Sequence, residues 1–182
     1  VRTSADKNLA VRMRTIIETP TVPEELAGVD LRHEDAVDFK VSSVILFSGK
    51  TGHRVSPIPN TGPMPPRVGQ KTTYMIVWEV RNFNNDLEDV SVRATLPPNV
   101  EWTGGRSPSD ADIAYDSASG EVRWNIKRLA AGVGILAPAL AGAFQVAVTP
   151  AVADAGRSVF LVNEARFTAR DGFTGQRREE RI

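Results

Sequence analysis

Apolar and polar residues alternate with a period of two through most of this chain. In the segment KTTYMIVWEV, the alternation predicts that Tyr74, Ile76, Trp78 and Val80 share one face of a strand. The same pattern recurs within residues 9–17, 37–47, 90–96, 122–126, 144–148 and 159–169. Since side chains at every second position of a strand lie on one face, each segment is expected to bury one face.

The breaks between these segments contain the residues that favour turns. NFNNDLED, LPPN, YDSASGE, TPAVADAGR and RDGFTGQ are rich in Asn, Asp, Gly, Pro and Ser. Only VPEELAGV suggests a helical turn, and the proline-rich residues 57–69 predict an extended crossing between two strands. Many short strands separated by turns favour an all-β fold, and we predict an antiparallel β-sandwich.

Two parts of the chain are expected to differ in kind. Residues 36–182 contain most of the alternating segments and are predicted to form the sandwich. Residues 1–35 are predicted to be an N-terminal arm or the tail of a preceding β module. Since one strand does not fold alone, the strand predicted within residues 1–28 either joins this sandwich or belongs to another module.

Composition excludes several classes of function. Lys and Arg number 22, as do Asp and Glu, so no net charge favours nucleic acid or an anionic membrane. The absence of Cys excludes disulfides, thiolate metal sites and cysteine nucleophiles. The chain starts at Val1 without a signal-like segment, which indicates a processed product or an excised fragment.

The longest uncharged run is LAAGVGILAPALAGAF, from Leu129 to Phe144. A spanning helix needs about 20 apolar residues, and this run is shorter and contains Pro138. We interpret it as an apolar loop that leads into a strand. Any membrane anchor is therefore expected to lie outside these residues.

No catalytic, cofactor or metal site is predicted. Gly132, Gly134 and Ala137 fit G-x-G-x-x-A, but Pro138 follows where a dinucleotide fold needs a helix. His33 and Glu34 are neighbours on one strand and are expected to point to opposite faces. Nucleophile-elbow, zinc-protease and Walker motifs are absent from the sequence.

Two acidic loops are candidates for a calcium ion. One contains Asp86, Glu88 and Asp89, and the other contains Asp110, Asp112 and Asp116. Calcium takes six to eight oxygen ligands, yet neither spacing is that of an EF-hand. The alternative is that these residues form turns through their own backbone bonds, and no metal is assigned to them.

An isopeptide cross-link needs an inward Lys beside an inward Asn. Parity places Asn163 inward, on the face of Leu161 and Ala165, where a buried amide bonded to backbone is expected. The available Lys residues lie outward by parity or at segment ends: Lys7, Lys40, Lys50, Lys71 and Lys127. No cross-link is therefore predicted.

Three Trp residues and one apolar loop are the remaining candidates for binding. Trp78 and Trp124 are in phase with apolar neighbours and are predicted to be core residues. Trp102, directly after the LPPNVE corner, is a possible interaction residue. Ile135 and Leu136 would be an unusual apolar patch if exposed, so they are possible interaction residues too.

The order of features from about residue 62 to 175 resembles a family of repeated bacterial envelope domains, the domain of unknown function eleven. The matching features are Gly69, TYMIVWEVRN, NNDLEDVSVRATLPPNVEW, YDSASGEVRWNIKRLAAG, FQVAVTP and VNEARFTARDGFTG. The resemblance implies an immunoglobulin-like sandwich whose LPPNVEW corner passes from one sheet to the other. It implies no catalytic residues, and residues 1 to about 35 lie outside it.

These observations lead to a ranked expectation about function. The first is a non-catalytic structural module of a bacterial cell-envelope or surface protein, acting as a spacer, stalk or lattice unit. Its partners would be neighbouring domains of the same protein, other envelope proteins or further copies of itself. The alternative is an adhesion module that binds a glycan or a protein through end loops and residues 132–142; an enzyme ranks last.

Overall fold

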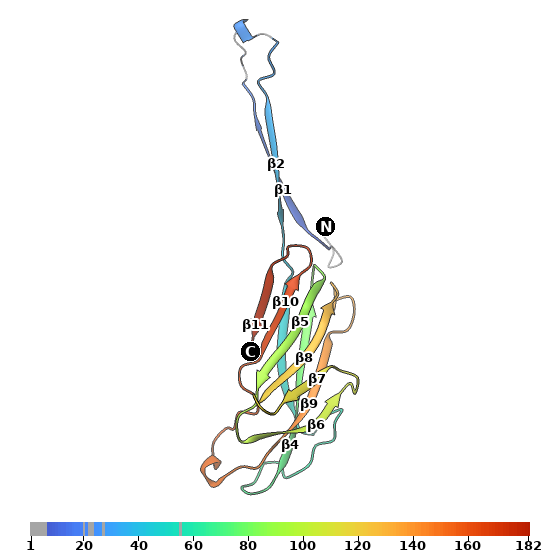
Figure 1. Ribbon diagram of the computed structural model, residues 1–182, viewed down its shortest axis with the longest axis vertical. Helices are drawn as coiled ribbons and strands as arrows, with labels where there is room; N and C mark the ends of the chain where they lie inside the picture. Colours follow the sequence, from blue (N-terminus) through green and yellow to red (C-terminus); the bar gives the residue numbers. More distant parts are fainter. Residues whose placement is uncertain (1–6, 20, 22–23, 27, 55) are drawn as a thin grey trace.

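The computed structural model describes residues 7–19, 21, 24–26, 28–54 and 56–182, which form a β-sandwich with a projecting hairpin (Figure 1). The four-stranded sheet has the order β3 (Ile45–Gly52), β4 (Thr72–Asn82), β9 (Leu140–Val148), β6 (Val100–Ser107). The five-stranded sheet has the order β11 (Arg177–Arg181), β10 (Arg166–Asp171), β5 (Leu87–Thr95), β8 (Glu121–Leu129), β7 (Ile113–Asp116). All pairs within both sheets are antiparallel, which confirms the predicted fold class.

The core forms where the alternating faces of the two sheets meet. Trp78 is 1% exposed and packs edge-on against Phe144, with ring centroids 4.8 Å apart. Trp124 lies so close to Gly142 that a Cβ there would approach its ring to 2.7 Å, which explains the glycine in β9. The predicted burial of both Trp residues is confirmed, and interdigitation of this kind gives native packing density.

The proline corner carries the chain from one sheet to the other. β5 ends at Thr95 in the five-stranded sheet, and β6 begins at Val100 in the four-stranded sheet. Pro97 and Pro98 lie between them and lack the N–H that would continue a ladder. The predicted change of sheet at this corner is confirmed.

The other predicted connections also hold. Residues 56–71 contain no strand, and residues 130–139 form a loop between β8 and β9. Across the described ranges, no helix is long and apolar enough to cross a membrane. The short helical elements are η1 (Glu24–Leu26), within VPEELAGV, and η2 (Val152–Asp154).

The hairpin, called the arm below, consists of β1 (Ala10–Ile17) and β2 (His33–Lys40). It extends away from one end of the sandwich along the long axis of the molecule (Figure 1). The expectation that Val37 and Phe39 are buried was wrong, because no second layer covers a two-stranded sheet; Phe39 is 53% exposed. The strand predicted within residues 1–28 pairs with β2, so the predicted boundary after residue 35 falls inside the arm.

The last predicted strand begins later than expected. Residues 159–165 form a loop, and β10 starts only at Arg166. The prediction of a buried Asn163 was therefore wrong, since parity applies only within a strand. Asn163 is exposed. Its side-chain amide donates to Thr95 Oγ1 at 2.9 Å, and its backbone N–H donates to Thr95 O.

Candidate interaction site

The two faces of the arm differ sharply in chemistry. On one face, cross-strand pairs bring Val11 opposite Phe39 and Met13 opposite Val37. Met13 is 54% exposed, and nothing else in the described chain packs on this face. An isolated two-stranded hairpin is marginally stable in water, so this apolar face is an unsatisfied surface.

The opposite face of the arm is charged and internally paired. Arg12 donates to both carboxylate oxygens of Asp38 at 2.7 and 2.8 Å, and this hydrogen bonding lowers the pKa of Asp38. Arg14 pairs with Glu34 in the same way. The predicted separation of His33 from Glu34 is confirmed, because His33 lies in the register of the apolar face.

The arm is tied to the sandwich by a buried polar network, called the socket below: Ser43, Asn82, Asn85 and Asp171. Asn85 contacts the residues that flank both strands at the base of the arm, since its side chain donates to Val41 O at 2.8 Å and accepts from the Asn8 backbone N–H at 3.1 Å. Ser43 Oγ donates to Asn82 Oδ1 at 2.6 Å. Buried groups with such complete bonding hold one geometry, so the socket fixes where the arm leaves the sandwich.

Asp171 is the charged member of the socket and is fully buried. Burial raises the pKa of this carboxyl, but hydrogen bonds from the Thr174 amide, the Asn85 side chain, the Ser43 amide and the Phe173 amide outweigh it, so the pKa lies below its ordinary value. Among the described residues, amide donors rather than a cation stabilise the charge.

Exposed contacts surround the socket. Lys7 Nζ lies 3.2 Å from Asp86, whose carboxylate also accepts from the Ala131 amide. Lys40 Nζ donates to Phe173 O and lies 4.8 Å from the centre of the Phe173 ring. Both strands of the arm are thus held at their base, whereas among the described residues the element contacts of β1 and β2 are with each other.

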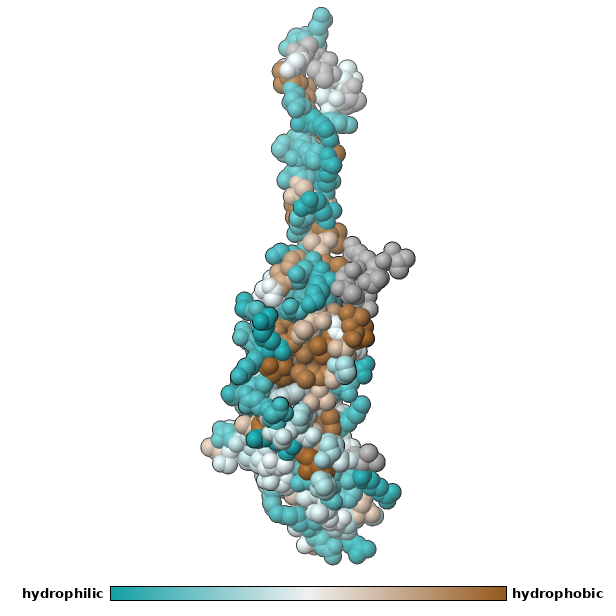
Figure 2. All heavy atoms as spheres, turned by 90° about the vertical axis from the view of Figure 1, so that its right-hand side faces the viewer, coloured by the Kyte–Doolittle hydropathy of each residue, from teal (hydrophilic) through white to brown (hydrophobic). Residues whose placement is uncertain are grey.

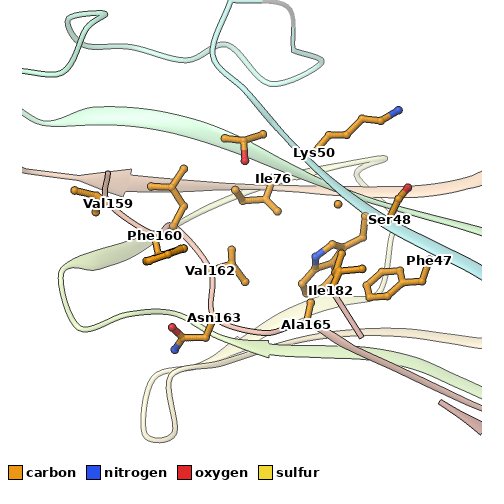
Figure 3. Close-up of a pocket in the computed structure, with 14 residues that line it drawn as sticks. Phe47, Ser48, Lys50, Ile76, Val159, Phe160, Val162, Asn163, Ala165 and Ile182 are labelled. Atoms are coloured by element: carbon orange, nitrogen blue, oxygen red, sulfur yellow. The ribbon is translucent and has the colours of Figure 1, made fainter. Parts of the chain in front are cut away.

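A groove of about 680 Å³ lies between the edge strand β3 and the loop of residues 159–165, and Ile182, which follows β11, also lines it. Its lining includes the buried residues Ile76, Trp78 and Ala165, so it reaches down to the core. Figure 3 shows Phe160 at this groove and Lys50 pointing away from it. Phe160 is 77% exposed, and within the described sheets β3 pairs only with β4.

The opposite flank of the sandwich carries the residues predicted for interaction. Trp102 on β6 stacks on Tyr115 of β7 with centroids 5.6 Å apart, which closes one part of that flank between the sheets. Ile135 and Leu136 lie on the loop between β8 and β9, and Leu136 is 63% exposed. Apolar surface is visible on this side of the sandwich in Figure 2. The structure does not bring Trp102 into contact with Ile135 or Leu136.

The acidic loops do not converge on a common point. Glu88 and Asp89 pair with Arg170, and Asp116 accepts from the Ala118 amide and the Ser119 hydroxyl. Within the part of the chain that the structure describes, no group of three His, Cys, Asp or Glu residues lies close enough for a metal ion. The turn-forming alternative fits the contacts of Asp116, whereas Glu88 and Asp89 lie in β5 and pair across the sheet.

The Lys residues follow the sequence-based interpretation. Lys40, Lys71 and Lys127 are exposed, as parity predicted. His53 is half-buried, and its Nδ1 lies 2.9 Å from Thr73 O. It therefore contributes to the fold of the region that follows β3.

The sequence-based reasoning missed the socket. Asn85 and Asp171 occur in NFNNDLED and RDGFTGQ, which were interpreted only as turns. Polar residues placed directly at the ends of apolar strands were the available signal. Burial turns them into the anchor of the arm, and only the folded chain reveals that they meet.

Comparisons with known proteins identify no family for this chain. No protein-family model matches this chain, and no curated protein sequence matches it. Among solved structures, the Fcho1 Mu homology domain of Danio rerio with bound Eps15 peptide is similar at 12% identity and a TM-score of 0.40. BcpA, the major pilin subunit of Bacillus cereus, is similar at 9% identity and a TM-score of 0.43.

The two structural similarities extend over most of this chain but over only about half of each matched structure. The Mu homology domain match covers 87% of this chain and 52% of that one, and the pilin match covers 93% and 46%. The chain therefore spans about half the length of the structures that it matches.

Proposed function

We propose that this chain is a non-catalytic structural module of a bacterial cell-envelope or surface protein, and that the arm is its contact element. The observation that carries the proposal is the apolar face of the arm, which is exposed although the base of the arm is held in place by the socket. The resemblance to the domain of unknown function eleven supports the envelope setting.

The conformational entropy cost of ordering the arm supports a contact role. Fixing each residue of a hairpin costs about 1–2 kcal/mol of conformational entropy, and this hairpin buries none of its own large apolar side chains. The socket fixes the base of this hairpin, although the hairpin has no hydrophobic core of its own. Burial of Val11, Met13, Val37 and Phe39 against a neighbour would offset that cost.

Light scattering over a wide concentration range tests this role. The mean mass is expected to rise with concentration for the native chain, and Met13→Ser is expected to reduce that rise because it removes apolar contact area. Arg12→Ser, on the opposite face of the same strand, is the matched control. A strict monomer, or equal effects of both substitutions, would count against the arm as the contact element.

A second candidate function rests on the loop between β8 and β9. Ile135 and Leu136 are exposed there, which favours an adhesion module that binds a glycan or a protein. Replacing both residues by Ser is expected to abolish binding to such a partner while the fold is retained. Retention of binding by that double variant would remove this candidate.

A further inference from the structure

We propose that β2 of a second copy of this chain pairs antiparallel with the free edge of β11. The same contact forms in return, so that the two copies exchange their arms. The inference rests on the proposed function, since it names the partner of the arm and the strand that receives it.

β11 and β2 each have one free edge within the described sheets, since β11 pairs only with β10 and β2 pairs only with β1. Figure 1 shows β11 at the left margin of the sandwich, and at the base of the arm β1 lies to the right of β2. Both free edges therefore face the same flank. Backbone groups on a free edge are a template for another strand.

The hydrogen bonds within the chain decide which residues of these two strands can pair. Ile182 exchanges both backbone bonds with Ala165, so the even-numbered residues of β11 bond to β10 and the odd-numbered residues have free N–H and C=O groups. In β2 the Val41 N–H donates to Leu9 O, so the odd-numbered residues bond to β1 and the even-numbered residues are free. Free groups meet when even-numbered residues of β2 lie opposite odd-numbered residues of β11.

Only two antiparallel registers of this kind place the whole of β11 within the length of β2. One of them puts Arg177 opposite Lys40. The same register puts Glu179 opposite Asp38. Like charges directly opposite each other are destabilising, so this register is excluded.

The remaining register is complementary in charge. Arg177 lies opposite Asp38, and Arg181 lies opposite Glu34. Glu179 lies opposite the uncharged Ala36. Opposite charges thus meet at both ends of the paired segment, which stabilises it.

Arg177 is the charged residue of β11 that most needs such a partner. It is exposed and forms no ion pair among the described residues, whereas Arg170 and Arg181 on the same face are both paired. Asp38 binds Arg12 on one side within the arm. Addition of β11 would bring Arg177 to the other side of this carboxylate.

β1 cannot take the place of β2 in this contact. Its free, even-numbered residues include Arg12 and Arg14. Every register that places the whole of β11 within β1 brings one of them opposite Arg177 or Arg181, which is repulsive.

The inner face of the same register brings a cation to the acidic residue in the apolar face of the arm. Asp35 would lie opposite Glu180 but diagonal to Arg178, and His33 would lie diagonal to Glu180. Diagonal neighbours are about 7–8 Å apart, within reach of long side chains. The Nε atom of Arg178 is buried and has no hydrogen-bond partner among the described residues, and the stem of this side chain would pack on Val37 opposite it.

This exchange closes at two chains. A two-fold axis that crosses the paired strands near the base of the arms relates the two β2–β11 contacts to each other. Because the arm projects along the long axis of the molecule, each arm can lie along the flank of its partner's sandwich (Figure 1). Such an isologous interface forms the same contacts twice and leaves no open end.

Cross-linking tests the register directly, because the native chain contains no Cys. Asp38→Cys protein mixed with Arg177→Cys protein is expected to form a disulfide-linked dimer on mild oxidation, since paired residues on neighbouring strands lie within disulfide reach. The second β2–β11 contact of that dimer keeps its native Asp38–Arg177 pair.

Two controls use the same chemistry. Arg12→Cys mixed with Arg177→Cys places the thiol on the same face of the arm but one strand farther from β11, so at least a tenfold lower yield is expected. Asp38→Cys protein oxidised alone is also expected to link poorly, because the two copies of residue 38 do not face each other. Equal yields in these three experiments would overturn the proposed register.

Charge reversal provides a test that does not involve Cys. Arg177→Glu is expected to weaken dimerisation at least tenfold, because its repulsive contact with Asp38 occurs twice in the dimer. Arg67→Glu makes the same change of charge at an exposed position in the loop before β4 and is expected to leave dimerisation unchanged. Equal effects of the two variants would contradict the pairing, as would a mass that keeps growing beyond two chains.

The outcomes also separate this inference from the proposed function. If Met13→Ser reduces association but Asp38→Cys and Arg177→Cys do not link, this inference falls and the proposed function stands. A strict monomer removes both.

Discussion

The arm and the sandwich have the same alternation in sequence but differ in what covers them. β2 and β5 are both antiparallel strands, eight and nine residues long. In β5 the apolar residues Val90, Val92 and Ala94 are buried by the facing sheet, whereas in β2 the residues Val37 and Phe39 face solvent. Alternation therefore specifies a strand with an apolar face, and burial depends on whether a second layer reaches that face.

The two regions also differ in what holds them together. The sandwich is stabilised by apolar packing between its sheets, and the arm is attached through hydrogen bonds of the socket. Apolar packing tolerates rearrangement of neighbouring side chains, but a buried polar network depends on every partner. The following predictions compare these two kinds of support, from the largest expected effect to the smallest.

Phe144→Ala is expected to lower the free energy of unfolding by about 3–5 kcal/mol, because the ring is fully buried against Trp78. Denaturant unfolding followed by Trp fluorescence measures this change. Phe39→Ala in the arm is the matched comparison and is expected to cost less than about 0.5 kcal/mol. Similar losses for both would show that the arm contributes to the same cooperative unit.

Asp171→Asn is expected to cost about 1–3 kcal/mol, because an amide group replaces an oxygen that accepts from buried N–H groups. Hydrogen exchange should then increase first at the base of the arm, around Val41. Asp116→Asn is the control, since that carboxylate caps an exposed turn. Uniform loosening of the sandwich with a protected arm would contradict the anchoring role.

The pH dependence of stability follows from the lowered pKa of Asp171. Because the folded pKa lies below the ordinary value of 3.8, its contribution is complete above that value and is lost as pH falls through the folded pKa. Unfolding free energy measured from pH 6 down to pH 2 should decline less steeply for Asp171→Asn than for the native chain. Parallel profiles would show that another carboxyl group controls the acid response.

Leu136→Ser is expected to change the free energy of unfolding by less than about 0.5 kcal/mol, because the side chain is mostly exposed. Leu140→Ser is the comparison, since Leu140 is half-buried against the core and should cost more. Thermal unfolding measures both. A large loss for Leu136→Ser would mean that this loop supports the sandwich.

Part of the candidate site could be predicted from the sequence, and part could not. The loop that carries Ile135 and Leu136 follows from a Gly- and Pro-rich run that neither helix nor strand can continue, and only the structure shows that both side chains are exposed. Asn163 was misplaced because strand parity was extended into a loop. The socket was missed because Ser43, Asn85 and Asp171 are far apart in sequence, and only the pairing of β5 with β10 brings the last two together.

The sequence by itself determined the local features: the strands β4, β5, β8 and β9, the turns between the strands, the proline corner and the inward faces of β4, β5 and β9. These depend on neighbouring residues, through side-chain alternation and the backbone limits of Pro and Gly. The tertiary structure alone decided which apolar faces are covered, that β1 pairs with β2, and that four polar residues form the socket. Those outcomes depend on contacts between distant segments, because burial is a property of the assembled layers and not of any one strand.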